Sequence, residues 1–206
     1  MTDRCVGSQC YNVTVRTEGG HSYGNFGNKN AINVLAEMVN EIYAIQVPEK
    51  EGTRTTYNVG TISGGTSVNT IAQEAQMLCE YRSDDLECLK LMEEKFKAIF
   101  NGKINSGYDI TVELVGNRPS ANIDVKKVEE LKDLIVPEIE DVIGGKVRFS
   151  SGSTDANIPL SLGVRALCIG TNDHEGIHTR EEWVDKKSLI SGLEIAIRAG
   201  IKLTEE

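Results

Sequence analysis

Apolar residues alternate with polar ones in four separate stretches of the first half of the chain. A period of two is typical of a strand with one face buried. The positions on the expected buried faces are Tyr11, Val13 and Val15; Tyr57, Val59 and Thr61; Ala75, Met77, Cys79 and Tyr81; and Tyr108, Ile110, Val112 and Leu114. The pattern therefore predicts four strands.

Two stretches between these strands have apolar residues at spacings of three and four, which predicts amphipathic helices. The first begins at Ala31 and ends before Pro48. The second follows Asp84 or Asp85, either of which can cap it, and is expected to end near Gly102. The two apolar stripes are Ala31, Leu35, Met38, Val39, Ile42 and Tyr43, and Leu89, Met92, Phe96, Ile99 and Phe100.

The resulting order over residues 5–116 is β-α-β-β-α-β. This is the ferredoxin-like, or split β-α-β, arrangement, in which a four-stranded antiparallel sheet carries two helices on one face. Such a sheet leaves an edge strand unpaired, and an unpaired edge is a template for another chain. We therefore expect residues 5–116 to form a homodimer through a sheet edge.

The second half of the chain, residues 117–206, predicts a different architecture. A helix can start at Asp124, and Pro137 is expected to kink or split it. Strands are expected at 147–149 and at 164–169, the second being a continuous apolar run as in a parallel strand covered on both faces. A last helix carries apolar residues at Leu189, Leu193, Ile197 and Ile201. Two strands are few for a parallel α/β sheet, so this half predicts only part of such a domain.

Composition excludes several classes of protein. The net charge of -9 repels phosphate backbones and anionic membrane surfaces, so we expect neither nucleic acid nor membrane as a partner. No apolar run approaches the roughly 18 residues that span a bilayer, and the first ten residues lack a hydrophobic signal core. Five cysteines without a C-x-x-C pair favour reduced thiols. These features predict a globular cytoplasmic protein.

The three histidines, His21, His174 and His178, lie near glycines in predicted loops, where functional residues concentrate. From the residues alone, each is more often a solvated surface side chain. His178 is the best candidate metal ligand, but a zinc site needs three or four converging ligands and no second histidine follows at a helical spacing. The residues alone do not predict a complete zinc site.

Ser153 lies between a predicted strand and a helix, which allows a serine-hydrolase hypothesis with His178 and an aspartate. The segment lacks the G-x-S-x-G frame of such enzymes. In the simpler interpretation, Thr154 or Asp155 caps a helix, and backbone amides there can bind an anion.

Five segments in this order resemble a known family: GGHSYGNFGNKNAI, TTYNVGTISGGTSVNTIA, EYRSDD, GSTDANIPLSLG and EGIHTREEWVD. The family is that of the co-catalytic zinc peptidases and amidohydrolases that include peptidase T, aminoacylase and carboxypeptidase G. The peptidase T-like branch is the most similar, and the resemblance extends over nearly the whole chain.

The resemblance implies that residues 5–116 are a lid and dimerisation domain, and that residues 117–206 are the C-terminal part of a zinc-binding α/β catalytic domain. The first half of that catalytic domain, with its H-x-D segment and general-base glutamate, does not occur in these 206 residues. The implied activity is hydrolysis of peptides or N-acyl amino acids by a water that bridges two zinc ions. By this interpretation the chain alone is inactive. The alternative is a non-catalytic dimerising interaction or regulatory module.

Residue by residue, the resemblance implies that His178 is a zinc ligand and that His21 polarises the scissile carbonyl in the active site of a partner subunit. The expected substrate contacts are Asn69, Arg82, Arg118, Gly152, Ser153 and Thr154. Aminopeptidases, carboxypeptidases and deacylases share these motifs, so the substrate stays open, as does the choice among zinc, cobalt and manganese.

Overall fold

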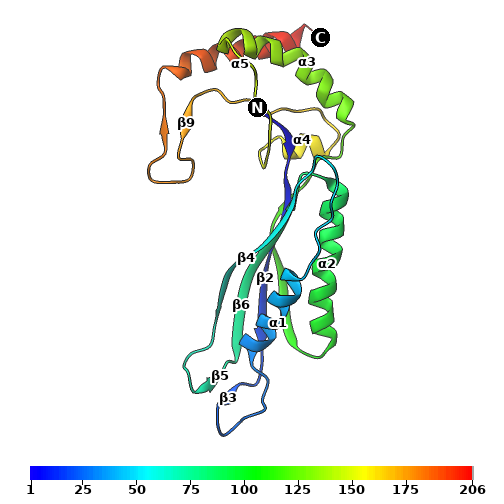
Figure 1. Ribbon diagram of the computed structural model, residues 1–206, viewed down its shortest axis with the longest axis vertical. Coiled ribbons are helices and arrows are strands. Elements are labelled where there is room, and N and C mark those ends of the chain that lie inside the picture. Colours follow the sequence, from blue (N-terminus) through cyan, green and yellow to red (C-terminus); the bar gives the residue numbers. More distant parts are fainter. Residues whose placement is uncertain (206) are drawn as a thin grey trace. The chain divides into compact units, whose positions relative to one another are not determined.

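The computed structural model describes residues 1–205 and divides the chain into two compact units (Figure 1). The lid unit is Val6–Ser120, and the C-terminal unit is Met1–Cys5 together with Ala121–Glu206. The expected division fell at residues 116 and 117. The structure extends the lid unit by four residues and assigns the first five residues to the C-terminal unit.

The lid unit has the element order expected from the alternation of apolar residues. Its main elements are β2 (Gly7–Arg16), α1 (Ala31–Tyr43), β4 (Thr55–Gly64), β6 (Glu74–Ser83), α2 (Leu86–Asn105) and β7 (Asp109–Arg118). The four strands form one antiparallel sheet in the order β4-β6-β2-β7. A separate short pair joins β3 (Gly20–His21) to β5 (Thr70–Ile71). The predicted ferredoxin-like fold is confirmed.

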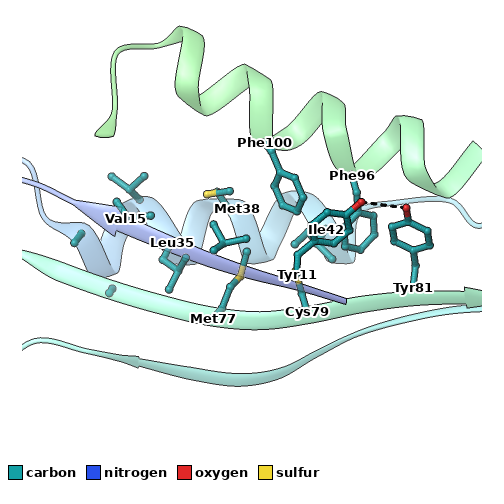
Figure 2. Close-up of a cluster of buried hydrophobic side chains, with 14 of the residues drawn as sticks. Tyr11, Val15, Leu35, Met38, Ile42, Met77, Cys79, Tyr81, Phe96 and Phe100 are labelled. Carbon is teal, nitrogen blue, oxygen red and sulfur yellow. Dashed lines mark hydrogen bonds between the residues drawn. The ribbon is translucent and has the colours of Figure 1, made fainter. Parts of the chain in front are cut away.

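The core of the lid unit lies between one face of this sheet and the two helices (Figure 2). The alternating residues of β2 and β6 point into it, because successive side chains of a strand face opposite sides. Phe96 of α2 is fully buried, and its ring centroid lies 4.8 Å from that of Tyr81 and 5.9 Å from that of Phe100. This packing holds the sheet rigid, so each residue on it has a fixed position along a strand.

The ends of α2 follow from two local features. Asp85 caps the N-terminus, because its Oδ1 accepts a hydrogen bond from the backbone N–H of Cys88 at 2.9 Å. The expected end near Gly102 is wrong, since α2 continues to Asn105. Gly107, with a φ of 83°, takes the left-handed conformation just beyond the helix instead.

The alternation of β4 is interrupted at Gly60. The register with β6 shifts between Val59 and Thr61, as in a β-bulge, so Thr61 lies opposite Leu78 and is exposed. The expected inward position of Thr61 is therefore wrong.

The C-terminal unit holds a small parallel sheet and helices. Its elements are β1 (Thr2–Cys5), α3 (Val125–Ile143), β8 (Ser150–Gly152), α4 (Asn157–Ser161), β9 (His174–Glu175), β10 (Trp183–Val184) and α5 (Ser188–Thr204). The parallel pair is β1 with β8, and β9 pairs with β10 in antiparallel fashion. Within residues 1–205, no helix has the length and apolar character needed to cross a membrane.

Of the two effects expected of Pro137, a kink or a split, the structure excludes the split, because the missing N–H removes only one backbone bond while Leu131, Ile135 and Ile139 pack against α5. Two other local expectations for this unit are wrong. No strand forms at the expected residues 147–149; the strand β8 begins just after them, at Ser150. The run 164–169 forms no strand, because only Cys168 bridges a neighbour, Thr2.

The face of α5 that packs in the core lies opposite the apolar stripe expected from the sequence. Gly192, Ile195 and Ala199 are buried, and the last two belong to the cluster with α3. The stripe residues are between 48% and 63% exposed: Leu189, Leu193, Ile197 and Ile201. This helix is thus apolar on both sides, which is typical of helices that lie between two layers of a domain.

Candidate functional site

His21 and Asn69 lie side by side at one end of the lid sheet, beyond the end of β2. His21 pairs with Thr70 in the β3–β5 ladder, and the N–H of Ser22 donates to the carbonyl of Asn69 at 2.9 Å. Both side chains are exposed. The backbone therefore brings together two residues that the resemblance assigned to substrate.

The two glycines before His21 are required by the loop that presents it. Gly19 and Gly20 have φ values of 64° and 137°, a region that side chains disfavour. A Cβ on Gly20 would also lie 2.7 Å from the Cβ of Asn25. Asn25 in turn binds His21 through its side chain and its backbone, a role that sequence reasoning missed. Its position four residues after the histidine was the available signal.

Arg82 and Arg118 lie at the other end of the same sheet. Arg82 on β6 and Arg118 on β7 are both paired with Ser8 of β2, so the three residues form one row across the sheet. Arg82 points away from the helices, because its neighbour Tyr81 points into the core. Residues in one row share a face, so both arginines lie on the face without helices.

The two pairs are far apart within one lid. The row at Ser8 and the row at Arg16 are separated by eight residues of β2, or about 25 Å at the rise of a strand, and His21 lies beyond Arg16. Figure 1 shows β3 and β5 at one extreme of the lid unit. The structure thus unites His21 with Asn69 and Arg82 with Arg118, but it does not unite the two pairs.

Arg82 is held by a carboxylate that sequence reasoning did not single out. Its Nε and Nη2 donate to Oε1 and Oε2 of Glu80 at 2.9 and 2.8 Å, a bidentate pair. The thiol of Cys10 donates to the same carboxylate at 3.4 Å. Arg82 lowers the pKa of Glu80, whereas burial and then Glu80 raise the pKa of Cys10. Glu80 therefore stays ionised and fixes the guanidinium, and Cys10 stays a thiol.

Gly152 is the last residue of β8 in the C-terminal unit, and Ser153 and Thr154 lead from it into α4. The Thr154 hydroxyl accepts a hydrogen bond from the N–H of Ala156 at 3.2 Å, and the N–H of Thr154 donates to the side chain of Asn157 at 2.9 Å. These two bonds close a local turn, but the N-cap residue of α4 is Ala156 and no side chain caps it, so the expected cap by Thr154 or Asp155 is wrong. Across residues 1–205, no hydrogen bond joins Ser153 to His178, so the serine-hydrolase pair is not assembled.

His178 lies in a tight turn between β9 and β10. The N–H of Thr179 donates to the carbonyl of Gly176 at 2.9 Å, and His178 has a φ of 67°, as at the third position of a type II turn. Glycine is favoured there, and no other non-glycine residue of the described chain has a positive φ. The turn therefore presents the exposed imidazole outward at some cost in backbone strain.

The residues that the structure describes do not complete a metal centre. A catalytic zinc ion needs about three protein ligands, and residues 1–205 contain no group of three histidine, cysteine, aspartate or glutamate side chains placed to hold one. His178 could supply a single ligand only.

Comparisons with known proteins agree with the ferredoxin-like fold of the lid unit. Residues 6–107 match the family model described as "Peptidase dimerisation domain". The aminopeptidase PepT from Bacillus cereus aligns with 98% of this chain and 53% of its own length, at 22% identity and a TM-score of 0.72. A tripeptidase from Staphylococcus aureus aligns with 98% and 52%, at 22% identity and a TM-score of 0.76. These structural matches show a shared fold.

One curated protein is also similar: "Uncharacterized protein YqjE" from Bacillus subtilis is 25% identical over 170 residues, which cover 82% of this chain and 44% of that protein. The chain thus spans about half the length of the proteins that it resembles.

The family match and the ferredoxin-like fold together define the class of the lid unit. Residues 6–107 are a peptidase dimerisation domain, and the resemblance found in the sequence is confirmed.

Proposed function

We propose that this chain is the dimerisation lid and part of the catalytic domain of a zinc-dependent peptidase or amidohydrolase. The family match of residues 6–107 supports the dimerisation role, and the separation of more than about 25 Å between the His21 pair and the arginine pair within one lid supports a site shared by two subunits. An extended dipeptide spans only about 7 Å. One small substrate therefore cannot contact both pairs of the same subunit, so His21 acts in the active site of a partner.

In this role the two ends of the lid contact different parts of a small peptide or N-acyl amino acid. Arginines on the helix-free face recognise a carboxylate through paired N–H donors, and Glu80 keeps Arg82 oriented for it. His21 donates to the carbonyl under attack, where negative charge develops. His178 contributes one ligand to a metal centre whose other ligands lie outside this chain, and the metal supplies an activated water.

The edge strand β4 is the proposed contact between subunits. Its ten residues include no charged side chain and no proline, the two commonest protections of a sheet edge. The opposite edge, β7, carries Asp109, Glu113 and Arg118. Exposed apolar side chains also accompany β4, namely Ile62 on the strand and Tyr43 on the adjacent α1. Pairing of β4 with its copy about a two-fold axis would extend the sheet across both lids.

Ile62→Lys is expected to weaken the dimer by about 10- to 100-fold, because each two-fold interface contains the position twice and a buried ammonium group loses its hydration. Ile62 is 56% exposed, so the lid itself stays folded. The matched control is Leu114→Lys on β7, where Leu114 is 52% exposed. Sedimentation equilibrium of the three proteins measures the effect. A monomeric unaltered protein, or equal weakening by both substitutions, would contradict the assignment of β4.

A non-catalytic dimerising or regulatory module is the second candidate. The observation in its favour is that residues 1–205 hold no complete metal site. The coding sequence upstream of Met1 separates the two, because an H-x-D segment and paired glutamates there would supply the remaining ligands and the base. Their absence would favour the regulatory module.

A further inference from the structure

The imidazole of His21 is bonded to its own loop through one ring nitrogen. The backbone N–H groups of Tyr23 and Gly24 both point at Nδ1, each with an N···N distance of 3.3 Å. No other side chain takes part in these two contacts. The ring is exposed, so its second nitrogen, Nε2, stands at the surface of the lid.

These two contacts determine which ring nitrogen carries the proton. A backbone N–H can only donate, so Nδ1 has to present its lone pair. A neutral imidazole carries one proton, which is then on Nε2. An imidazole held in this way offers an N–H donor at the surface and has no free lone pair there to accept a proton.

We propose that the loop 20–25 fixes His21 as its Nε2–H tautomer and that Asn25 is the positioning residue of this loop. The inference rests on the proposed function in one respect, that His21 contacts substrate. It deepens that function by naming the loop contacts that fix the ring: because Nδ1 accepts from the loop, the proton of a neutral His21 is on Nε2, and no ring lone pair is left to abstract a proton.

Asn25 closes the loop from both sides. Its Oδ1 accepts a hydrogen bond from the N–H of His21 at 2.9 Å, and its own N–H donates to the carbonyl of His21 at 2.8 Å. Its side chain also packs over Gly20, where a Cβ would not fit. This reciprocal pair holds the intervening Tyr23 and Gly24 with their N–H groups turned toward the ring. Without it, the two donors are no longer aimed at Nδ1.

The chain contains a second histidine, His174, whose contact favours the other tautomer. Nδ1 of His174 lies 2.7 Å from the side-chain oxygen of Asn172. A carbonyl oxygen only accepts, so Nδ1 of His174 carries the proton. His174 is therefore an internal reference, exposed like His21 but with the other tautomer expected.

Nitrogen-15 NMR of the imidazole rings, with one-bond and two-bond couplings to the ring protons, tests the inference on residues 1–206. The spectra are recorded on neutral rings, at an alkaline pH where the ring nitrogen shifts no longer change with pH. Substitution of each histidine in turn assigns the signals. We expect His21 to show an unprotonated Nδ1 and a protonated Nε2, and His174 the reverse.

Two variants test the role of Asn25. Asn25→Ala is expected to move both His21 nitrogen signals toward the average of the two tautomers. Asn25→Asp keeps an oxygen acceptor for the N–H of His21 and is expected to retain the original signals. The backbone amide signals of β2 and β6 report whether the lid is folded. A proton on Nδ1 of His21 in the unaltered protein, or no change in Asn25→Ala, would overturn the inference.

This experiment needs no substrate and no metal, so its result is independent of the proposed function. An Nε2–H tautomer in a protein whose His21 proves dispensable for hydrolysis would contradict the proposed function alone. The other tautomer in a protein that needs His21 in the partner site would overturn this inference alone.

Discussion

Gly192→Ala is expected to destabilise the C-terminal unit by at least about 3 kcal/mol, whereas Gly200→Ala in the same helix stabilises it by up to about 1 kcal/mol. A Cβ on Gly192 would lie 1.6 Å from the carbonyl oxygen of Thr171, a backbone atom that cannot rotate away. A Cβ on Gly200 would meet no atom within 4 Å. Both glycines lie inside α5, so the two substitutions change helix propensity alike. The difference between their effects on unfolding free energy therefore measures the steric clash at Gly192.

Denaturant unfolding followed by tryptophan fluorescence measures the two effects. The chain has one tryptophan, Trp183, and it lies on β10 of the C-terminal unit, so the signal reports that unit alone. Far-ultraviolet circular dichroism sums the helices of both units, so a transition that it shows and the tryptophan does not belongs to the lid. Equal unfolding midpoints for the two variants would contradict the packing of α5 against Thr171.

Residues 1–206 by themselves are expected to show no peptidase turnover and to bind zinc at least about a thousandfold more weakly than a site with three protein ligands. The reason is that His178 is the single candidate ligand assigned by the resemblance, and residues 1–205 assemble no ligand cluster. Calorimetric titration of chelator-stripped protein with zinc gives the affinity, and a dipeptide panel gives the turnover.

His178→Ala is the control for that titration. If zinc binds only to scattered surface groups, this substitution changes the isotherm little. Submicromolar binding that His178→Ala abolishes, together with turnover, would show that this chain holds a complete enzyme and would contradict the proposed division of the site.

The lid could be predicted from the sequence because each of its strands has only one buried face. In β2 the alternation of apolar and polar residues is unbroken from Tyr11 to Arg16, and in β6 only Leu78 departs from it between Glu74 and Arg82, so period and topology agree. The bulge at Gly60 was not predictable, because one extra residue in β4 changes the facing of Thr61 without changing its composition.

The C-terminal unit was harder to predict because its elements are apolar on more than one side. The stripe of α5 has helical period, but a second apolar face with Gly192 and Ala199 packs on α3 instead. Periodicity predicts that such a segment is a helix, but it does not predict which of the two apolar faces packs in the core. The strand β1 was missed because TDRC does not alternate and its partner, β8, lies almost 150 residues away in the sequence.

The candidate site was likewise only partly predictable from the sequence. The residue types at His21, Asn69, Arg82 and Arg118 came from sequence motifs that the structure does not test by itself. Their division into two pairs at opposite ends of one sheet depends on strand register, which no motif contains. The loop contacts of Asn25 depend in addition on the positive φ values of Gly19 and Gly20.

Subunit mixing tests the central claim, that His21 serves the active site of the partner. The measurement uses a polypeptide that combines this chain with the catalytic half that the proposed function requires. One subunit carries His21→Ala and the other His178→Ala, each inactive alone. In a mixed dimer, one site then retains both an intact metal ligand and an intact lid histidine, so a random mixture is expected to recover roughly a quarter of the unaltered activity. No recovery, with subunit exchange verified by mass, would show that His21 acts within its own subunit.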